Sequence, residues 1–173
     1  RSNTAINICS KAIADKVASI SLGIYKTEKI GEGSFKKLIK EDPRYKLLHW
    51  EPNGYTTSFV FWHTMEITKQ RNGNSFAIIH KFPDTNTIAL EFIHPSFLVG
   101  KPFFERGILK YTFSSNEGNV TYDSSKIIHF KGESDDGIMG NNPYNILNEE
   151  VKRAYLANKT ITNYYENDGK STK

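Results

Sequence analysis

The chain has 173 residues and a mass of 19.7 kDa, enough for one domain with a sizeable core or for two small ones. Hydrophobic residues make up 38% and charged residues 24%, which excludes a mostly disordered chain, and no apolar run approaches the roughly 20 residues of a membrane-spanning helix. The formal net charge of +4 is spread along the sequence without a block of like charges, so a dedicated nucleic-acid clamp is not indicated.

The first element predicted is a helix from Asn3 to Ile20. Its apolar positions recur at three- and four-residue steps and would form one buried stripe: Ile6, Cys9, Ile13, Val17 and Ile20. Cys9, the single cysteine, would be a small core residue, and no intrachain disulfide can form. Alternation at Ile20, Leu22 and Ile24 then predicts a short strand ending near Tyr25, and the polar, glycine-bearing stretch 26–41 predicts a surface loop.

Two helices are predicted next. Asp42 followed by Pro43 is typical of a helix start, and Pro52, Asn53 and Gly54 would end this short helix. A second helix should run from about Thr57 to Gln70. We expect Phe59, Trp62 and Met65 on its inner face, and Gly73 as the left-handed residue that ends it.

The middle of the chain is rich in strand-forming residues. Strands are predicted at 75–81, 87–94, 109–114, 120–123 and 126–131, with a hairpin turn at Asn116 to Asn119. A last helix should begin at Asn142 and Pro143 and run to about Glu166, followed by a frayed tail, 168–173. The predicted fold class is α+β: N-terminal helices, a central and mostly antiparallel β region with hairpins, and a long C-terminal helix.

The last helix carries a stripe at alternating four- and three-residue spacing: Leu147, Val151, Ala154, Asn158, Ile161 and Tyr165. The stripe either packs on the sheet or meets a neighbouring subunit or a further segment. Ile161→Ala would cost about 2 to 4 kcal/mol in the first case and almost nothing in the second.

The sequence contains no evident catalytic or metal-binding constellation, and we predict neither an enzyme nor a cofactor. The string from Ile30 to Phe35 is similar to the glycine-rich loop of protein kinases, but the lysine, catalytic loop and metal-binding motif of kinases are missing. His80, His94 and His129 each fall near the end of a predicted strand. Whether these three side chains converge stays open at this point.

Six segments, in order, resemble the family of tailed-bacteriophage portal proteins. They are the opening helix with its following strand, the stretch from Asp42 to Asn53, the Gly73-Asn74 strand start, Ile93-His94-Pro95, the 127–140 strand and loop, and Tyr164 to Gly169. The positions that match the family motifs are Pro43, Leu47, Leu48, Glu51, Pro52, Asn53, Gly73, Asn74, Pro95, His129, Gly137, Gly140, Pro143, Asn167 and Gly169. Two departures are Asn141-Asn142-Pro143, where Leu-Ser-Pro is expected, and Asp168 inserted before Gly169.

The resemblance implies a structural role without a bond-making step. Residues 1–173 would form a single wing region of a portal subunit, with the stem, clip and crown segments absent. The full-length protein would form a dodecameric ring through which double-stranded DNA enters and leaves the capsid. Its partners would be the packaging terminase, the neck or tail adaptor and capsid proteins. It would reside in the virion, and in the host cytoplasm before assembly, without contacting a membrane.

Two alternatives of other classes remain. The chain could be an enzyme with a site built from the strand-end histidines, which zinc bound at three histidines would reveal. It could also be a single-strand nucleic-acid-binding domain that stacks bases on its aromatic residues, for which steep salt dependence of oligonucleotide binding would be evidence. The sequence does not identify nucleic-acid-binding or subunit-interface residues.

Overall fold

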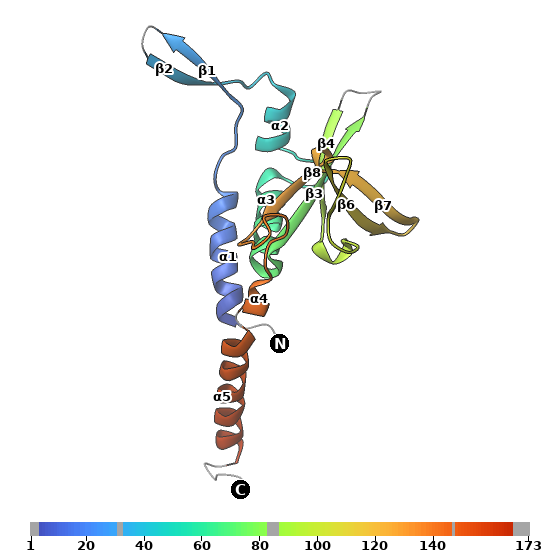
Figure 1. Cartoon of the computed structure of the whole chain (residues 1–173). Coiled ribbons are helices and arrows are strands. Elements are labelled where there is room, and N and C mark those ends of the chain that lie inside the picture. The colour runs from blue at the N-terminus through green and yellow to red at the C-terminus, as the bar shows by residue number, and fades with distance from the viewer. Residues whose placement is uncertain (1–3, 31–32, 83–86, 147, 168–173) are drawn as a thin grey trace.

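A computed structural model describes residues 4–30, 33–82, 87–146 and 148–167 and has the predicted α+β architecture (Figure 1). Its helices are α1 (Thr4–Ala18), α2 (Pro43–His49), α3 (Ser58–Asn72), α4 (Pro143–Ile146) and α5 (Asn148–Glu166), with short 3-10 helices η1 (Pro95–Phe97) and η2 (Ser124–Lys126). Its strands are β1 (Tyr25–Ile30), β2 (Gly33–Leu38), β3 (Asn74–Phe82), β4 (Thr87–Ile93), β5 (Phe103–Glu105), β6 (Ile108–Ser115), β7 (Gly118–Asp123) and β8 (Ile127–Lys131).

The body of the molecule is built around strand β3. This strand is the middle one of an antiparallel sheet with the order β4-β3-β8. One face of the sheet packs on α3, through a core that contains Phe61, Trp62, Met65, Ala77 and Leu90. The other face packs on the antiparallel β5-β6-β7 sheet, through Phe76, Ile78, Tyr111, Phe113 and Ile127. Because β3 is covered on both faces, its first five residues are all buried.

Helix α1 lies beside α3, but on a different face from the one predicted. Its buried residues are small: Ser10, Ala14 and Ala18. Small side chains let two helices approach closely, and this excludes the bulkier positions from the contact. Ile13 is 43% exposed and Cys9 is exposed, so the predicted core role of Cys9 is wrong.

The segment predicted as a strand and a loop is a β-hairpin. Residues 21–24 form no strand, and the predicted loop 26–41 instead contains most of β1 and all of β2, an antiparallel pair with Tyr25 opposite Leu38. All described side chains of β2 are exposed except that of Leu38, which is partly buried, and the hairpin projects from the body (Figure 1). Without a buried face the two strands lack apolar alternation, which is why the sequence looked like a loop.

The predicted start of α2 and end of α3 are confirmed by their caps. Asp42 accepts a hydrogen bond from the backbone N–H of Arg44 at the start of α2, and Gly73 ends α3 at φ 76°. The predicted inner face of α3 is correct for Trp62 and Met65. It is wrong for Phe59, which is 47% exposed, while Phe61 is buried instead.

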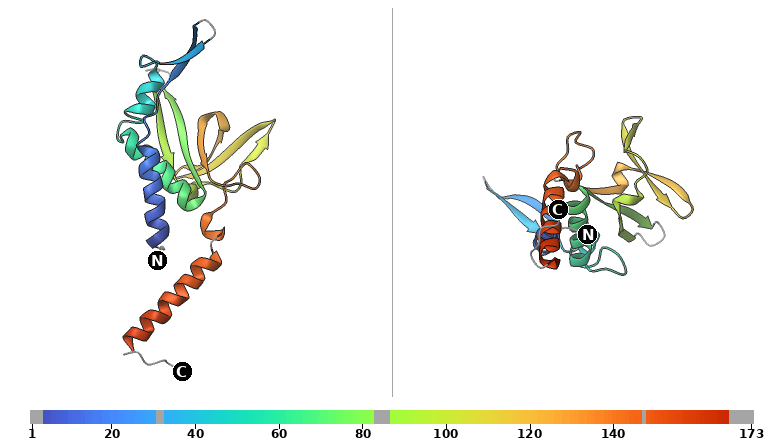
Figure 2. Two further views of the ribbon diagram at one scale, coloured as in Figure 1. Left: turned by 90° about the vertical axis from the view of Figure 1, so that its left-hand side faces the viewer. Right: turned by 90° about the horizontal axis from the view of Figure 1, so that it is seen from below.

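The five predicted strands of the middle region are present, and the β6–β7 hairpin turns at Asn116 and Glu117 as expected. The short strand β5 was not predicted. The predicted last helix is found as two helical segments, α4 and α5, with Leu147 between them outside the described residues. Helix α5 extends away from the body (Figure 2). The predicted frayed tail, 168–173, also lies outside the described residues.

Candidate functional site

The motif positions between Pro43 and Asn53 lie at the junction between α2 and strand β4. Pro52 is fully buried, and its carbonyl accepts the backbone N–H of Leu90 at 2.7 Å. The Asn53 side-chain amide donates to the carbonyl of the same Leu90 at 2.9 Å. Together these bonds continue the sheet beyond β4, because they satisfy both backbone groups of Leu90 on its outer edge. Glu51 is exposed and lies 3.5 Å from Lys46.

The end of α2 is held by α3. The carbonyl of Leu48, in the last turn of α2, accepts the Ser58 hydroxyl at 2.6 Å and the Trp62 indole N–H at 3.2 Å. These bonds satisfy a carbonyl that has no partner within its own helix. Leu47 and Leu48 also pack against the core of which Trp62 is part. At the other end of α2, hydrogen bonds from Arg44 hold the pKa of Asp42 at about 2, well below its ordinary value.

A second junction forms around Asn74, the first residue of β3, which is 5% exposed. Its side-chain amide donates to the carbonyl of Gly140 at 2.7 Å, and its Oδ1 accepts the N–H of Gly140, also at 2.7 Å. The pair of bonds fixes which amide atom is oxygen and which is nitrogen. The same oxygen lies 2.9 Å from Nε2 of His129. An oxygen can only accept, so Nε2 carries the proton, and Nδ1 accepts the hydroxyl of Tyr111 at 3.2 Å.

The network around Asn74 therefore connects β3, β6, β8 and the loop that leads to α4. Burial holds the pKa of His129 down at about 4, and Lys131 adds to this, so the imidazole is neutral at pH 7. A neutral ring fits its two bonds, one donated and one accepted. In this arrangement His129 is a structural residue that fastens two sheets to one loop.

Close backbone contact at the same junction requires glycine. A Cβ on Gly73 would lie 2.1 Å from the carbonyl oxygen of Asn141, and one on Gly140 would lie 2.0 Å from the carbonyl oxygen of Gly73. Real side chains do not approach backbone atoms this closely. Four of the motif positions inferred from sequence, which are far apart in the chain, thus meet at one point: Gly73, Asn74, His129 and Gly140.

The remaining motif positions lie apart from these two junctions. Pro95 begins η1, Pro143 begins α4, and Gly137 occupies a turn at φ 70°. Asn167 follows the end of α5, with its N–H bonded to the carbonyl of Asn163 at 3.1 Å. Gly169 lies outside the described residues.

The strand-end histidines each have a partner of their own. His80 lies 2.6 Å from a carboxylate oxygen of Glu91, His94 contacts Ser96 at 2.8 Å, and His129 belongs to the Asn74 network. Within the described ranges, no three His, Cys, Asp or Glu side chains are grouped so that they could hold a metal ion. Nor is any helix of those ranges long and apolar enough to cross a membrane.

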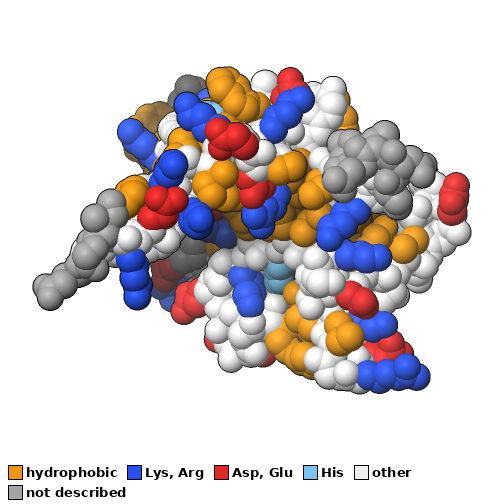
Figure 3. All heavy atoms as spheres, turned by 90° about the horizontal axis from the view of Figure 1, so that it is seen from above, with side chains coloured by type: hydrophobic (Ala, Val, Ile, Leu, Met, Phe, Trp, Pro, Cys, Tyr) orange, Lys and Arg blue, Asp and Glu red, His pale blue; other side chains and the backbone are white. Residues whose placement is uncertain are grey.

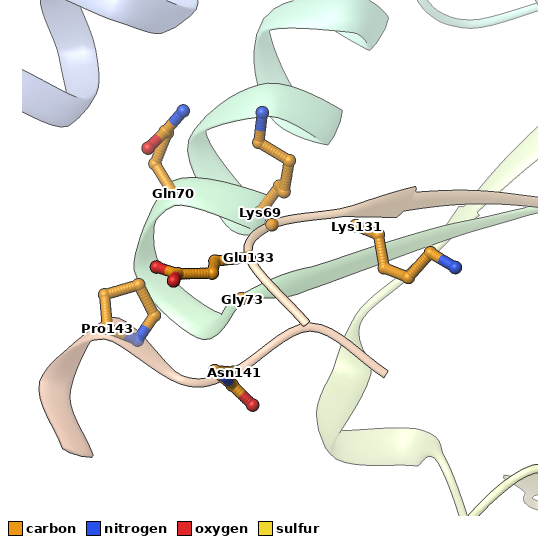
Figure 4. A pocket seen from close by; sticks show the side chains of 8 residues that line it. Lys69, Gln70, Gly73, Lys131, Glu133, Asn141 and Pro143 are labelled. Atoms are coloured by element: carbon orange, nitrogen blue, oxygen red, sulfur yellow. The ribbon is translucent and has the colours of Figure 1, made fainter. Parts of the chain in front are cut away.

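A hollow of about 570 Å³ opens beside the Asn74 junction, where α3 ends and the loop to α4 passes (Figure 4). Its two lysines are already engaged. Lys69 pairs with the buried Glu66 at 2.7 Å, and the ammonium of Lys131 donates to the carbonyl of Gly137 and points away from Lys69. Glu133 lies between Lys69 and Pro143 in this view. We find no nucleophile with an adjacent base among the described residues that line this hollow.

Sequence reasoning missed the partners of the motif residues. Tyr111, which bonds His129, and Leu90, which pairs with Pro52 and Asn53, are both nearly fully buried. The only local signal for either is its place in a predicted strand. Contacts such as Asn74 with Gly140 join residues 66 positions apart, and no local pattern predicts them.

The sequence profile of the phage portal proteins matches residues 4–172. The chain belongs to the phage portal protein family. It is 22% identical, over 163 residues, to the portal protein of Enterobacteria phage HK97, and the match covers 94% of this chain and 38% of that protein. The resemblance inferred from the motif segments is therefore confirmed.

The fold is also that of a solved structure described as the neck of an empty GTA particle, computed with C6 symmetry. The two chains superpose with a TM-score of 0.70 at 13% identity, over 99% of this chain and 44% of the other. This chain therefore spans less than half the length of the HK97 portal protein and less than half the length of the GTA neck chain.

Proposed function

We propose that this chain is a structural part of a phage portal subunit, one of many copies that form the ring at one capsid vertex. The observation that carries this proposal is the family match, which extends over almost the whole chain, residues 4–172. In the ring, the chain would help to form the conduit for double-stranded DNA and the surface to which the packaging motor and the neck or tail proteins dock.

The contacts at the two junctions support a structural role. The side chains that would be the first candidates for chemistry, such as His129 and Asn74, are tied to backbone groups and to one another. They form a scaffold that holds two sheets, α2, α3 and the loop to α4 in place. We therefore propose that the chain has no catalytic step and resides in the virion.

Exposed hydrophobic side chains support an assembled state. They occur on α1, on the hairpin between β5 and β6, and on α5, including Ile8, Phe104 and Tyr165, which are 64%, 63% and 76% exposed. Seen from above, hydrophobic side chains gather near the middle of the face, with charged side chains around them (Figure 3). Ring closure by identical copies requires two different contact faces on each subunit, and surfaces of this kind would supply them.

The proposal can be tested in the particles produced by cells that encode this chain. A gold-labelled antibody against the chain should mark a single vertex of each particle. Loss of the coding sequence should leave heads without packaged DNA. Label at every vertex, or DNA-filled tailed particles made without the chain, would overturn the proposal.

A further inference from the structure

Helix α5 presents an apolar surface that this chain does not cover. Every side chain described between Glu150 and Asn167 is exposed, and within the described ranges the substantial contacts of α5 are with α4. The large hydrophobic residues concerned are Tyr155, Leu156, Ile161, Tyr164 and Tyr165, at 61%, 60%, 54%, 52% and 76% exposure. In proteins most of the stability of a helix comes from the packing of its apolar face and not from helix propensity, so an apolar face left uncovered over this length indicates a partner.

The apolar residues of α5 spread over about half of the helix circumference. With roughly 100° between successive residues, Tyr155 falls on one flank of this half, and Ala157 and Tyr164 fall on the opposite flank, with Ala154 and Ile161 between. Leu156 is the exception and lies on the polar half. A two-stranded coiled coil uses a narrower seam than this. The breadth of the face indicates contact with two helices at once.

At the same height along α5, the side chains on its two flanks differ in size. Tyr155 is a large side chain on one flank, whereas the residues nearest to it on the other side are Ala154 and Ala157. Each of these alanines lies within about 3 Å of Tyr155 along the axis, because each residue rises about 1.5 Å. A tyrosine on one helix could therefore occupy the space above two alanines of a parallel neighbour.

We propose that α5 of each copy packs in parallel against α5 of the next copy around the portal ring, with Tyr155 of one copy seated at Ala154 and Ala157 of the next. The inference rests on the proposed function, because a closed ring of identical copies places equivalent helices at equal height and joins two different faces. Among the described side chains of this half, the one that carries a charge at pH 7 is Glu150, and it pairs with Arg153 at 3.2 Å. The contact therefore requires no burial of like charges.

Disulfide trapping tests this contact directly. The test protein carries Tyr155→Cys and Ala157→Cys in a Cys9→Ser background, since Cys9 is exposed and would itself react. The two introduced thiols point to opposite flanks and cannot meet within one helix. Oxidation of the concentrated protein should give a ladder of trimers and larger covalent oligomers on a non-reducing gel. Each single-cysteine variant should stay monomeric.

A matched pair controls for random collision. Arg153→Cys with Lys159→Cys places two thiols on the polar half of the same helix, and the ladder from the 155/157 pair should be severalfold stronger. Circular dichroism of each variant verifies that the helix content is unchanged.

Two results would overturn the inference. Covalent dimers from the Tyr155→Cys variant alone would mean that equal faces of α5 meet, as in a two-fold pair. A 155/157 ladder no stronger than that of the polar pair would mean that α5 meets a different partner. Either result, combined with antibody label at a single vertex, would reject this contact while leaving the portal function in place. Loss of the single-vertex label would reject the function itself.

Discussion

The Asn74 junction provides a stability prediction that can be worked out atom by atom. Asn74→Ala removes two hydrogen bonds to Gly140 and one to His129, at 2.7, 2.7 and 2.9 Å. Three polar groups then lose their partner in a region where Asn74 and Gly140 are both buried. Each such group costs roughly 1 kcal/mol or more, so unfolding should become easier by about 3 to 5 kcal/mol. That is a large part of the stability of a small domain, which is about 5 to 15 kcal/mol.

Denaturant unfolding at pH 7, monitored by circular dichroism, measures this loss. Asn119→Ala serves as the matched control, because Asn119 lies exposed on β7 and should change the unfolding free energy by less than about 0.5 kcal/mol. The m-value should be the same in both variants, so that the shift in midpoint reports stability alone. If Asn74→Ala unfolds within about 0.5 kcal/mol of the unchanged protein, the network does not hold the sheets together and the reasoning fails.

Three further predictions concern His129, Gly73 and Ile161. The pKa of His129 is about 4 in the folded chain and about 6.5 in the unfolded chain. As the pH falls from 6.5 to 4, the imidazole therefore takes up a proton mainly in the unfolded state. Stability should drop by about 2 to 3 kcal/mol between pH 6.5 and 4, and His129→Gln should remove this part of the pH dependence; an identical pH profile for the variant would contradict it. Gly73→Ala should cost at least about 2 kcal/mol more than Gly137→Ala, since both glycines have φ near 70° but only Gly73 has a neighbour within 4 Å; equal losses would count against the close contact. Ile161→Ala should change the unfolding free energy by under about 0.5 kcal/mol, because Ile161 is 54% exposed; a loss of about 2 kcal/mol or more would mean that the helix packs on the body.

The sequence predicted elements well where a local signal marks their ends. The boundaries of α2 and α3 followed from Asp42, Pro43 and Gly73, whose backbone chemistry is local. The β6–β7 hairpin followed from its turn residues. The β1–β2 hairpin did not, because strand prediction from periodicity depends on one buried face, and this hairpin is mostly exposed.

Helices α1 and α5 show the same limit of periodicity. The stripe of α1 predicts a face turned to the core of the same chain, whereas the stripe of α5 leaves open whether the sheet, a neighbouring subunit or a further segment covers it. In α1 the buried face is made of Ser10, Ala14 and Ala18, and Ile13 is left partly exposed. In α5 the stripe residue Ile161 is exposed, which favours the alternative that its partner is not the sheet. Periodicity shows that a helix has an apolar face, but it does not show which molecule covers that face.

The division between buried junctions and exposed elements suggests how the chain could serve a ring. The motif residues secure the body: Pro52 and Asn53 hold α2 and α3 to β4, and Asn74 holds the loop to α4. The elements that carry exposed apolar residues, α5 above all, lie outside this network. A helix that gains its main contacts only from a neighbouring copy is ordered most fully when the ring closes, and the conformational entropy lost in that ordering is subtracted from the free energy that its contacts contribute to the association. Stability of the body and stability of the assembly would in this way depend on different residues, so a substitution at Asn74 and one at Tyr155 should affect different measurements.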